Sequence, residues 1–155
     1  MNFFRNPGDR LLIAAHRGYR SIRPENSLCA FEASRGHCHF IELDIQMSRD
    51  GIAVVHHDTL AGRTSDAREL AKKLGKRSLR IDEWDLAELR QLDIGSWFLK
   101  ADPFGVLKDG LVAAEELRHL LPQRILTLTE LLDWRNRVEI PLNVELKDQR
   151  GRRHD

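Results

Sequence analysis

The alternation of hydrophobic and polar residues marks four short segments of the chain as β-strands. Apolar runs or a two-residue alternation occupy residues 11–15 (LLIAA), 40–45 (FIELDI), 52–56 (IAVVH) and 140–146 (IPLNVEL). Helix signals lie between or after these segments, and strands that alternate with helices are typical of parallel β-α units. The pattern therefore predicts an α/β fold built on a parallel sheet.

Polar capping residues predict where three helices begin. A capping side chain accepts a hydrogen bond from a free N–H of the first turn, and a Glu three positions later completes a capping box. The three predicted starts are Asn26 or Ser27, Asp85 with Glu88, and Thr127 with Glu130. Gly36 and Gly95 follow the first two starts and are expected to end those helices.

The stretch from residue 58 to residue 125 is rich in charge and turn residues and is too long for an ordinary loop. We expect a long connection or a small insertion over one end of the sheet, with a helix near 85–92 inside it. A chain of 155 residues with 41% hydrophobic content is long enough for one core. We therefore expect residues 1–155 to form a single domain.

Charge and cysteine content narrow the classes of partner. The 25 Lys and Arg residues nearly balance the 24 Asp and Glu residues, so the net field does not favour nucleic acid or an acidic membrane. Cys29 and Cys38 lack metal-binding or redox spacing, and we expect reduced thiols. Because no apolar run reaches the length of a membrane span or a signal core, we expect a cytoplasmic protein without a transmembrane segment.

Charged side chains share one face of two predicted strands. A period of two places Glu42 and Asp44 opposite the apolar side chains of their strand, and Glu145 and Lys147 likewise share one face of theirs. The apolar faces must pack against helices. The charged faces then point away from the helices, which in a barrel means into the lumen.

All four predicted strands end in ionisable residues. The first ends in His16 and Arg17, and the third ends in His57 and Asp58. The carboxyl ends of parallel strands are where α/β sheets and barrels build active sites. Since His56 and His57 must point to opposite sides, we assign His57 to the site and His56 to packing or hydrogen bonding. Gly18 allows a close turn of the backbone after the first strand.

Three carboxylates are candidate metal ligands. Glu42, Asp44 and Glu145 would repel one another by roughly 4 kcal/mol per pair at about 4 Å and an effective dielectric constant of 20. A hard divalent ion, Mg²⁺ or Ca²⁺, removes that repulsion and prefers oxygen ligands. The alternative is that a Glu-x-Asp or Glu-x-Lys pattern marks an exposed polar face with weak salt bridges. The similar ending of four separate strands favours the site.

Two histidines and two cations complete the predicted chemistry. His16 and His57 titrate near neutral pH when unperturbed, so they suit a general base and a general acid. Arg17 and Lys147 suit an anionic group, such as a phosphate. Taken alone, His16 is equally consistent with a core histidine held by hydrogen bonds.

Several short motifs occur in a fixed order along the chain. They are His16-Arg17-Gly18, Pro24-Glu25-Asn26-Ser27, Glu42-Leu43-Asp44, Asp50-Gly51 and His57-Asp58, followed by Arg63-Thr64, LRQLDIGSWF (89–98), LTLTELL (126–132) and NVELK (143–147). In this order and approximate spacing the sequence resembles the glycerophosphodiester phosphodiesterase family from about residue 11 to residue 147. Ser27 and Leu126 stand where the family pattern has threonine and proline.

The resemblance implies a parallel (β/α) TIM-type barrel and the hydrolysis of a glycerophosphodiester to glycerol 3-phosphate and an alcohol. It implies roles for the same seven residues: His16 and His57 as the acid/base pair, Glu42, Asp44 and Glu145 on a divalent metal, and Arg17 and Lys147 near the phosphate. Two alternatives stay open: a lysophospholipase D-type activity, and a catalytically inactive remnant or interaction module.

The length departs from the family pattern. A complete barrel of this type takes about 250 residues, and about four strands are predicted here. The expectation is therefore a truncated domain, either a piece of a longer enzyme or a half barrel that pairs with a second copy to cover its open edges.

Overall fold

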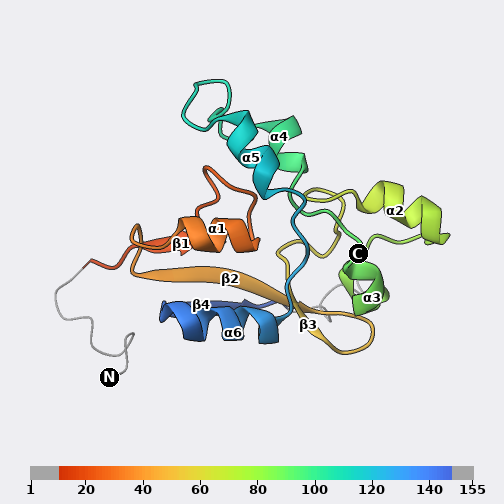
Figure 1. The fold of residues 1–155 in the computed structure, drawn as a ribbon. Coiled ribbons are helices and arrows are strands. Elements are labelled where there is room, and N and C mark those ends of the chain that lie inside the picture. The colour runs from red at the N-terminus through yellow and green to blue at the C-terminus, as the bar shows by residue number, and fades with distance from the viewer. Residues whose placement is uncertain (1–10, 148–155) are drawn as a thin grey trace.

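The computed structural model describes residues 11–147, which form a four-stranded sheet centred on β2 (Phe40–Met47). β2 pairs in parallel with β1 (Ala14–His16) and with β4 (Leu142–Leu146), as predicted. Ile45 pairs with Val55 of β3 (Ala53–Val55) and with Leu146 of β4, so β3 and β4 flank β2 on opposite sides. Figure 1 shows β2 running through the middle of the molecule.

The third strand is not part of a parallel unit, contrary to the prediction. β3 runs antiparallel to β2. Residues 48–52 join the two strands, and a parallel crossover needs about a dozen residues or more. The joining turn is held by Ser48, whose hydroxyl donates to Asp50 and accepts from the Ile52 N–H, and Gly51 takes a positive φ of 79°. The parallel part of the sheet therefore contains β1, β2 and β4.

Two helices cover one face of this sheet. The N-cap of α1 (Leu28–Ala33) is Ser27, whose hydroxyl accepts from the Ala30 N–H, and the helix ends at Ser34 rather than at Gly36. The predicted capping box of Thr127 and Glu130 opens α6 (Leu128–Val138). Both helices pack on the apolar face of β2 through a buried cluster of Phe31, Ile41, Leu43, Ile45, Val55, Leu131, Trp134 and Ile140. The charged face of β2 is thereby turned away from the helices, as predicted.

The connection from residue 58 to residue 125 has structure of its own. It contains α2 (Ala67–Leu74), a 3₁₀ turn η1 (Ile81–Glu83), α3 (Leu86–Leu89), α4 (Trp97–Ala101) and α5 (Ala114–Leu120). The predicted capping box of Asp85 and Glu88 is present, but the helix is a single turn that ends at Leu89. The chain then turns, so that Leu92 and Ile94 join Trp84 in a second buried cluster.

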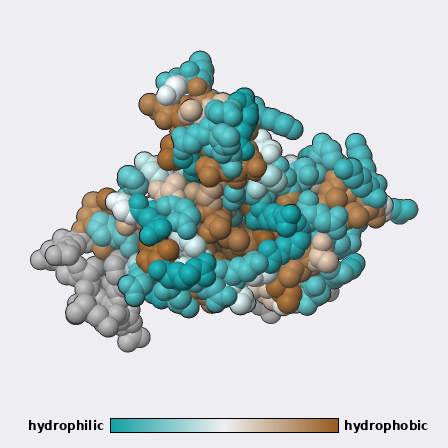
Figure 2. Space-filling view, viewed as in Figure 1, coloured by the Kyte–Doolittle hydropathy of each residue, from teal (hydrophilic) through white to brown (hydrophobic). Residues whose placement is uncertain are grey.

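A third small cluster lies in the arm that carries α4 and α5, around Phe98, Val106, Val112 and Leu117. In Figure 2 hydrophobic residues interrupt the hydrophilic surface between this arm and the sheet.

Cys29 and Cys38 are free thiols, as expected. None of the helices in residues 11–147 has the length and hydropathy that a membrane crossing requires.

Candidate active site

Three carboxylates meet on the face of the sheet opposite α1 and α6. Glu42 and Asp44 come from β2, and Glu145 comes from β4, where its Cα is the register partner of Asp44. One oxygen from each of the three lies within 4.8 Å of the others. Asp44 is fully buried, Glu42 is half-buried and Glu145 is exposed. The parallel pairing of two strands distant in sequence thus creates the predicted carboxylate cluster.

The electrostatics of Glu42 show that negative charge is crowded here. Burial raises the pKa of Glu42, and the neighbouring charges of Asp44 and Glu145 raise it further. For Asp44, burial alone would raise the pKa, but the hydrogen bond from Asn26 Nδ2 (3.0 Å) and the charge of Lys147 outweigh burial and lower it. Asp44 therefore stays ionised while Glu42 resists ionisation.

The buried oxygen atoms of this cluster fit a cation. Among the described residues, Asp44 Oδ1 and Asn26 Oδ1 are buried without a hydrogen-bond partner. Asp44 Oδ1 does have a cation beside it, because Lys147 Nζ lies 2.9 Å away and forms an ion pair with it. Buried acceptor atoms beside three carboxylates are the oxygen-only donor set that Mg²⁺ and Ca²⁺ prefer. The residues present therefore fit a hard divalent ion.

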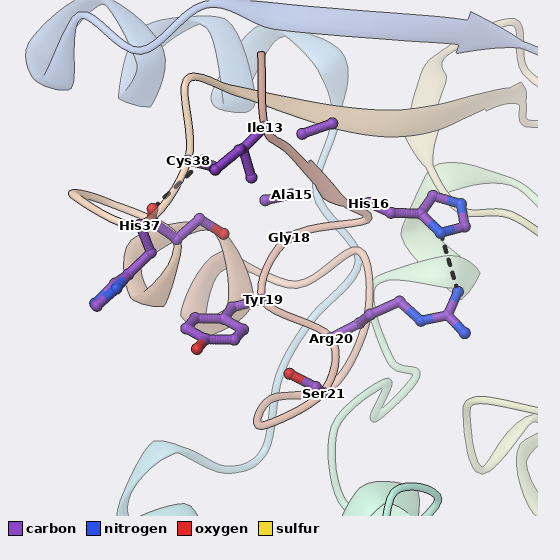
Figure 3. Close-up of a pocket in the computed structure, with 11 residues that line it drawn as sticks. Ile13, Ala15, His16, Gly18, Tyr19, Arg20, Ser21, His37 and Cys38 are labelled. Atoms are coloured by element: carbon purple, nitrogen blue, oxygen red, sulfur yellow. Dashed lines mark hydrogen bonds between the residues drawn. The ribbon is translucent and has the colours of Figure 1, made fainter. Parts of the chain in front are cut away.

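The two candidate histidines flank the cluster from different elements. His16, the last residue of β1, places Nε2 3.7 Å from Glu42 Oε2 and Nδ1 3.2 Å from Arg20 Nη1. Figure 3 shows the His16–Arg20 hydrogen bond at one end of a pocket of about 300 Å³ beside β1. His57 follows β3 and places Nδ1 2.6 Å from Asp58 Oδ1. Both rings are partly exposed, at 54% for His16 and 30% for His57.

His56 and His57 lie in different surroundings. The His56 ring is buried, and burial lowers its pKa to about 4, so this ring is neutral at pH 7. Gln46 holds the backbone of the pair, because its Nε2 donates to the carbonyl oxygens of His56, His57 and Asp58. Gln46 was not among the predicted site residues. Its place on the charged face of β2 was the only sequence feature that could have indicated its role.

The two predicted anion-binding cations are both held by carboxylates. Arg17 Nη1 donates to Glu25 Oε1 at 3.0 Å, and its Nε lies 3.4 Å from Asp44 Oδ2. Lys147 pairs with Asp44 and Glu145; burial lowers its pKa, but these two partners outweigh burial and raise it. The structure therefore brings both cations to the cluster and uses their charge to offset the carboxylates.

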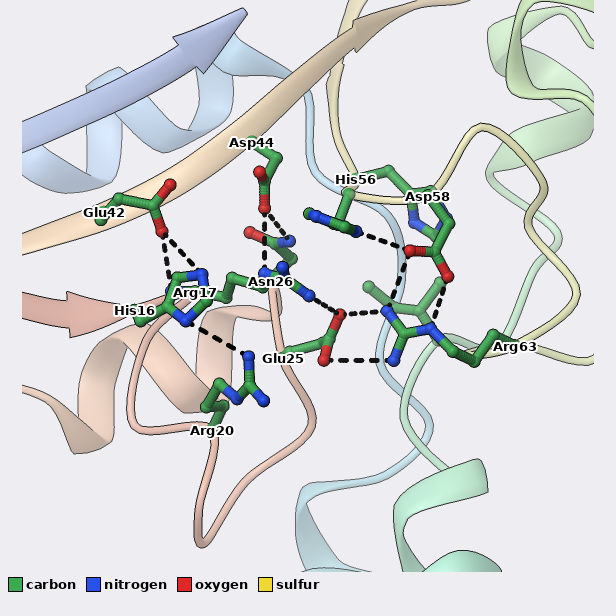
Figure 4. Close-up of polar contacts among 12 residues, drawn as sticks. His16, Arg17, Arg20, Glu25, Asn26, Glu42, Asp44, His56, Asp58 and Arg63 are labelled. Carbon is green, nitrogen blue, oxygen red and sulfur yellow. Dashed lines mark hydrogen bonds and ion pairs between the residues drawn. The ribbon is translucent and has the colours of Figure 1, made fainter. Parts of the chain in front are cut away.

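A second chain of ion pairs was not predicted from the sequence. Glu25 joins Arg17 to Arg63, and Arg63 Nη2 lies 2.6 Å from Glu25 Oε1 while its Nε donates to Asp58 Oδ2 (Figure 4). Burial would raise the pKa of Asp58, but Arg63 and His57 outweigh it and lower the pKa to about 2. Glu25, Asp58 and Arg63 all lie in the motifs of the resemblance. The individual roles depend on contacts between loops that the sequence does not specify.

Gly18 has a packing role at the start of this network. Its φ is 82°, and an added Cβ would lie 2.8 Å from the Ala30 Cβ and 2.9 Å from the Ala30 backbone carbon. A side chain at residue 18 would push the turn away from α1. This close approach keeps Arg17 and Asn26 directed at Asp44, because the Asn26 N–H also donates to the Arg17 carbonyl.

Comparison with known proteins identifies the family. Residues 16–155 match the model of the glycerophosphoryl diester phosphodiesterase family. The chain belongs to that family. Glycerophosphodiester phosphodiesterase domain-containing protein 5 of Mus musculus is 31% identical over 127 residues, or 81% of this chain and 20% of that protein. The glycerophosphodiester phosphodiesterase of Bacillus subtilis is 38% identical over 96 residues, or 61% of this chain and 29% of that protein.

Solved structures of the family share the fold. A phosphodiesterase of Oleispira antarctica, in complex with the product sn-glycerol-3-phosphate, has a TM-score of 0.64 and is 30% identical, covering 88% of this chain and 44% of that one. A glycerophosphodiester phosphodiesterase of Agrobacterium tumefaciens has a TM-score of 0.65 with 24% identity and supports the fold assignment alone. The TIM-barrel fold class predicted from the sequence is confirmed. The chain spans less than half of these two family structures.

Proposed function

We propose that the chain carries the metal and acid/base part of a site that hydrolyses glycerophosphodiesters to glycerol 3-phosphate and an alcohol. The observation that carries this proposal is the cluster of Glu42, Asp44 and Glu145 within 4.8 Å, with His16 and His57 beside it. The family membership and the glycerol 3-phosphate complex of the Oleispira antarctica protein support the same reaction.

The three carboxylates would hold the divalent ion, with Mg²⁺ and Ca²⁺ as the candidates. When bound, the ion supplies positive charge against a phosphoryl oxygen and offsets the charge that develops during hydrolysis. Arg17 and Lys147 are the proposed phosphate-binding cations. Arg17 is held in place by Glu25, which orients its guanidinium, whereas Lys147 can exchange its carboxylate partners for the phosphate.

The hydrogen bonds of the two histidines suggest different protonation roles. Asp58 is ionised and only accepts, so His57 donates from Nδ1 and keeps a lone pair on Nε2. Arg20 only donates, so His16 accepts at Nδ1 and carries its proton on Nε2. We infer that His57 is the general base, taking a proton from water or from the neighbouring glycerol hydroxyl. His16 is then the general acid: once its Nδ1 is released from Arg20 and protonated, the imidazolium gives a proton to the leaving alcohol and returns to the neutral ring.

The pocket beside His57 favours glycerophosphodiesters over lysolipids. Arg63, Arg68 and Lys147 line it together with His57. A lysophospholipase D-type activity would need an apolar groove for an acyl chain at this position. Leu60 and Leu79 also line the pocket, but an acyl chain there would lie against the three charged side chains as well. The inactive-remnant alternative is left to the activity assay below.

We also propose that the described residues are part of a larger barrel domain. Residues 58–125 would form its long connection, and a further barrel segment would cover the open sheet edges. Leu11, Ile13 and Leu146 support this, because they are 86%, 52% and 75% exposed at β1 and β4. A second copy of the chain is the alternative covering partner.

The proposed function is tested by hydrolysis of glycerophosphocholine with Mg²⁺ or Ca²⁺, with and without a chelator. The wild-type chain is compared with H16A and H57A, and with H119A as a control, because His119 is 77% exposed and lies on α5. We expect metal-dependent release of glycerol 3-phosphate that falls at least about 100-fold in H16A and H57A. Activity that survives both chelation and H16A excludes the proposed mechanism, and no activity in any sample favours the inactive remnant.

A further inference from the structure

A pocket of about 670 Å³ opens beside the proposed reaction centre. His57 and Lys147 line it on the side of the carboxylate cluster, and Leu60, Arg63, Arg68 and Leu79 are among the residues that line the rest. The pocket is large enough for a substituent of several heavy atoms. Its position next to His57 places it where part of a bound phosphodiester would extend.

The cations of this pocket differ in how far their charge is already neutralised. Arg63 pairs with Glu25 and Asp58, and Lys147 pairs with Asp44 and Glu145. Arg68 is exposed, and no carboxylate within residues 11–147 forms an ion pair with it. Arg68 therefore presents a guanidinium whose five N–H donors are available to a ligand.

The location of Arg68 is poorly explained by helix stability. It is the second residue of α2, near the positive end of the helix dipole, where a cation is unfavourable. The guanidinium lies over Gly62, because a Cβ on Gly62 would be 3.6 Å from Arg68 Nε and 3.0 Å from Leu79 Cδ1. The absence of a side chain at residue 62 gives the guanidinium its place at the wall of the pocket.

We propose that Arg68 is a specificity-determining residue that binds an anionic group on the alcohol part of the substrate, such as a phosphate monoester. This inference rests on the proposed function for the position of the scissile phosphodiester. The glycerol end of a glycerophosphodiester is uncharged, so a cationic pocket distinguishes substrates only through the alcohol. A guanidinium pairs well with a phosphate because its donors match two phosphate oxygens at once.

The test measures binding without turnover. Affinities for glycerophosphoinositol and glycerophosphoinositol 4-phosphate, which differ by one phosphate, are measured by calorimetry in the presence of a chelator. The proteins are the wild-type chain, R68Q, and K72Q as a control on an exposed part of α2 outside the pocket. We expect the phosphorylated compound to bind wild type about tenfold more tightly, and R68Q to remove most of this preference while changing the other affinity less than about twofold.

Several outcomes would overturn the inference. The inference fails if wild type binds the two compounds with equal affinity or does not bind the phosphorylated compound. It also fails if R68Q weakens the binding of both compounds equally, or if K72Q loses the same preference as R68Q. Circular dichroism of R68Q shows whether the variant is folded, and R68K should retain part of the preference. Hydrolysis assays separate this inference from the proposed function. Hydrolysis of both diesters at equal efficiency would support the proposed function and contradict the role of Arg68. Selective binding of the phosphorylated compound without hydrolysis would support the role of Arg68 and contradict the proposed function.

Discussion

Lys147 Nζ lies 2.9 Å from Asp44 Oδ1, so the side chain after β4 neutralises the buried carboxylate of β2. Asp44 is fully buried and depends on Lys147, Asn26 and Arg17 for its compensation. A divalent ion at the same carboxylates would take over part of this task. Lys147 thus links the stability of the sheet to the occupancy of the proposed metal site.

We predict that K147Q lowers the free energy of unfolding by about 2 kcal/mol in the presence of a chelator, because Asp44 loses a charged partner. Adding Mg²⁺ or Ca²⁺ should stabilise K147Q more than it stabilises wild type. Urea unfolding with and without metal measures both effects, and K72Q is the surface control. An unfolding free energy equal to that of wild type would contradict the ion pair.

Removing the charge of Glu42 should have the opposite effect on the metal-free protein. The pKa of Glu42 is raised by burial and by Asp44, so its ionised form destabilises the fold once the pH exceeds that pKa. We predict that E42Q has a higher melting temperature than wild type at pH 8 with a chelator present. It should also lose most of the stabilisation by metal, which is about 2.7 kcal/mol at a metal concentration 100 times Kd.

Differential scanning fluorimetry with and without metal tests E42Q. E69Q, which removes an exposed charge from the first turn of α2, is its control. If E42Q retained the full metal-induced shift, Glu42 would not be a ligand.

Arg63 is predicted to position the base through Asp58. Asp58 holds His57 Nδ1, and Arg63 holds Asp58 in turn. We predict that R63Q reduces kcat about 100-fold and raises the pKa of Asp58 above its value of about 2, so that the loss is larger at low pH, where a protonated Asp58 no longer holds His57 Nδ1. R63K should recover part of the activity. A uniform loss at every pH, matched by the exposed-site control R124Q, would argue against this role.

His56 should make the fold sensitive to mild acid. Its pKa is lowered to about 4 in the folded state, against 6.5 when unperturbed. The unfolded chain therefore binds a proton first as the pH falls, and stability is lost between about pH 6.5 and pH 4. The loss from this residue is at most about 3 kcal/mol. Asp58, with a pKa of about 2, adds a separate loss only at lower pH.

We predict that H56Q reduces the dependence of the unfolding free energy on pH between pH 6.5 and pH 4. Urea unfolding at several pH values measures this, with H119Q as an exposed-histidine control. A slope unchanged by H56Q would show that other groups cause the acid sensitivity.

The open edges of the sheet predict self-association of the isolated chain. Ile13 beside β1 and Leu146 at the end of β4 are 52% and 75% exposed, at separate edges of the sheet. We predict that light scattering after size exclusion gives a mass above that of one chain, and that L146K shifts the population toward monomer. A folded monomer that does not bind a hydrophobic dye would contradict both proposed ways of covering these edges.

The fold class and much of the site were predictable because they depend on local patterns. A period of two along β2 decided that Glu42 and Asp44 share a face, and the capping residues decided where α1 and α6 begin. The antiparallel direction of β3 was missed, although the short turn at 48–52 carried that information. The length of the helix after Asp85 was also missed. The helix ends at Leu89, and Leu92 and Ile94 are buried in the core beyond it through contacts with residues distant in sequence, which a local pattern does not show.

By itself, the sequence determined which side chains lie on the charged faces of the strands, because successive side chains of a strand point to opposite faces of the sheet in any surroundings. Only the tertiary structure decided how those side chains are paired. The Glu25–Arg63–Asp58 chain, the burial of His56 and the exposure of Arg68, which has no ion-pair partner among residues 11–147, depend on where distant loops pack. Long-range packing sets the distances and the burial on which Coulomb energies and pKa values depend.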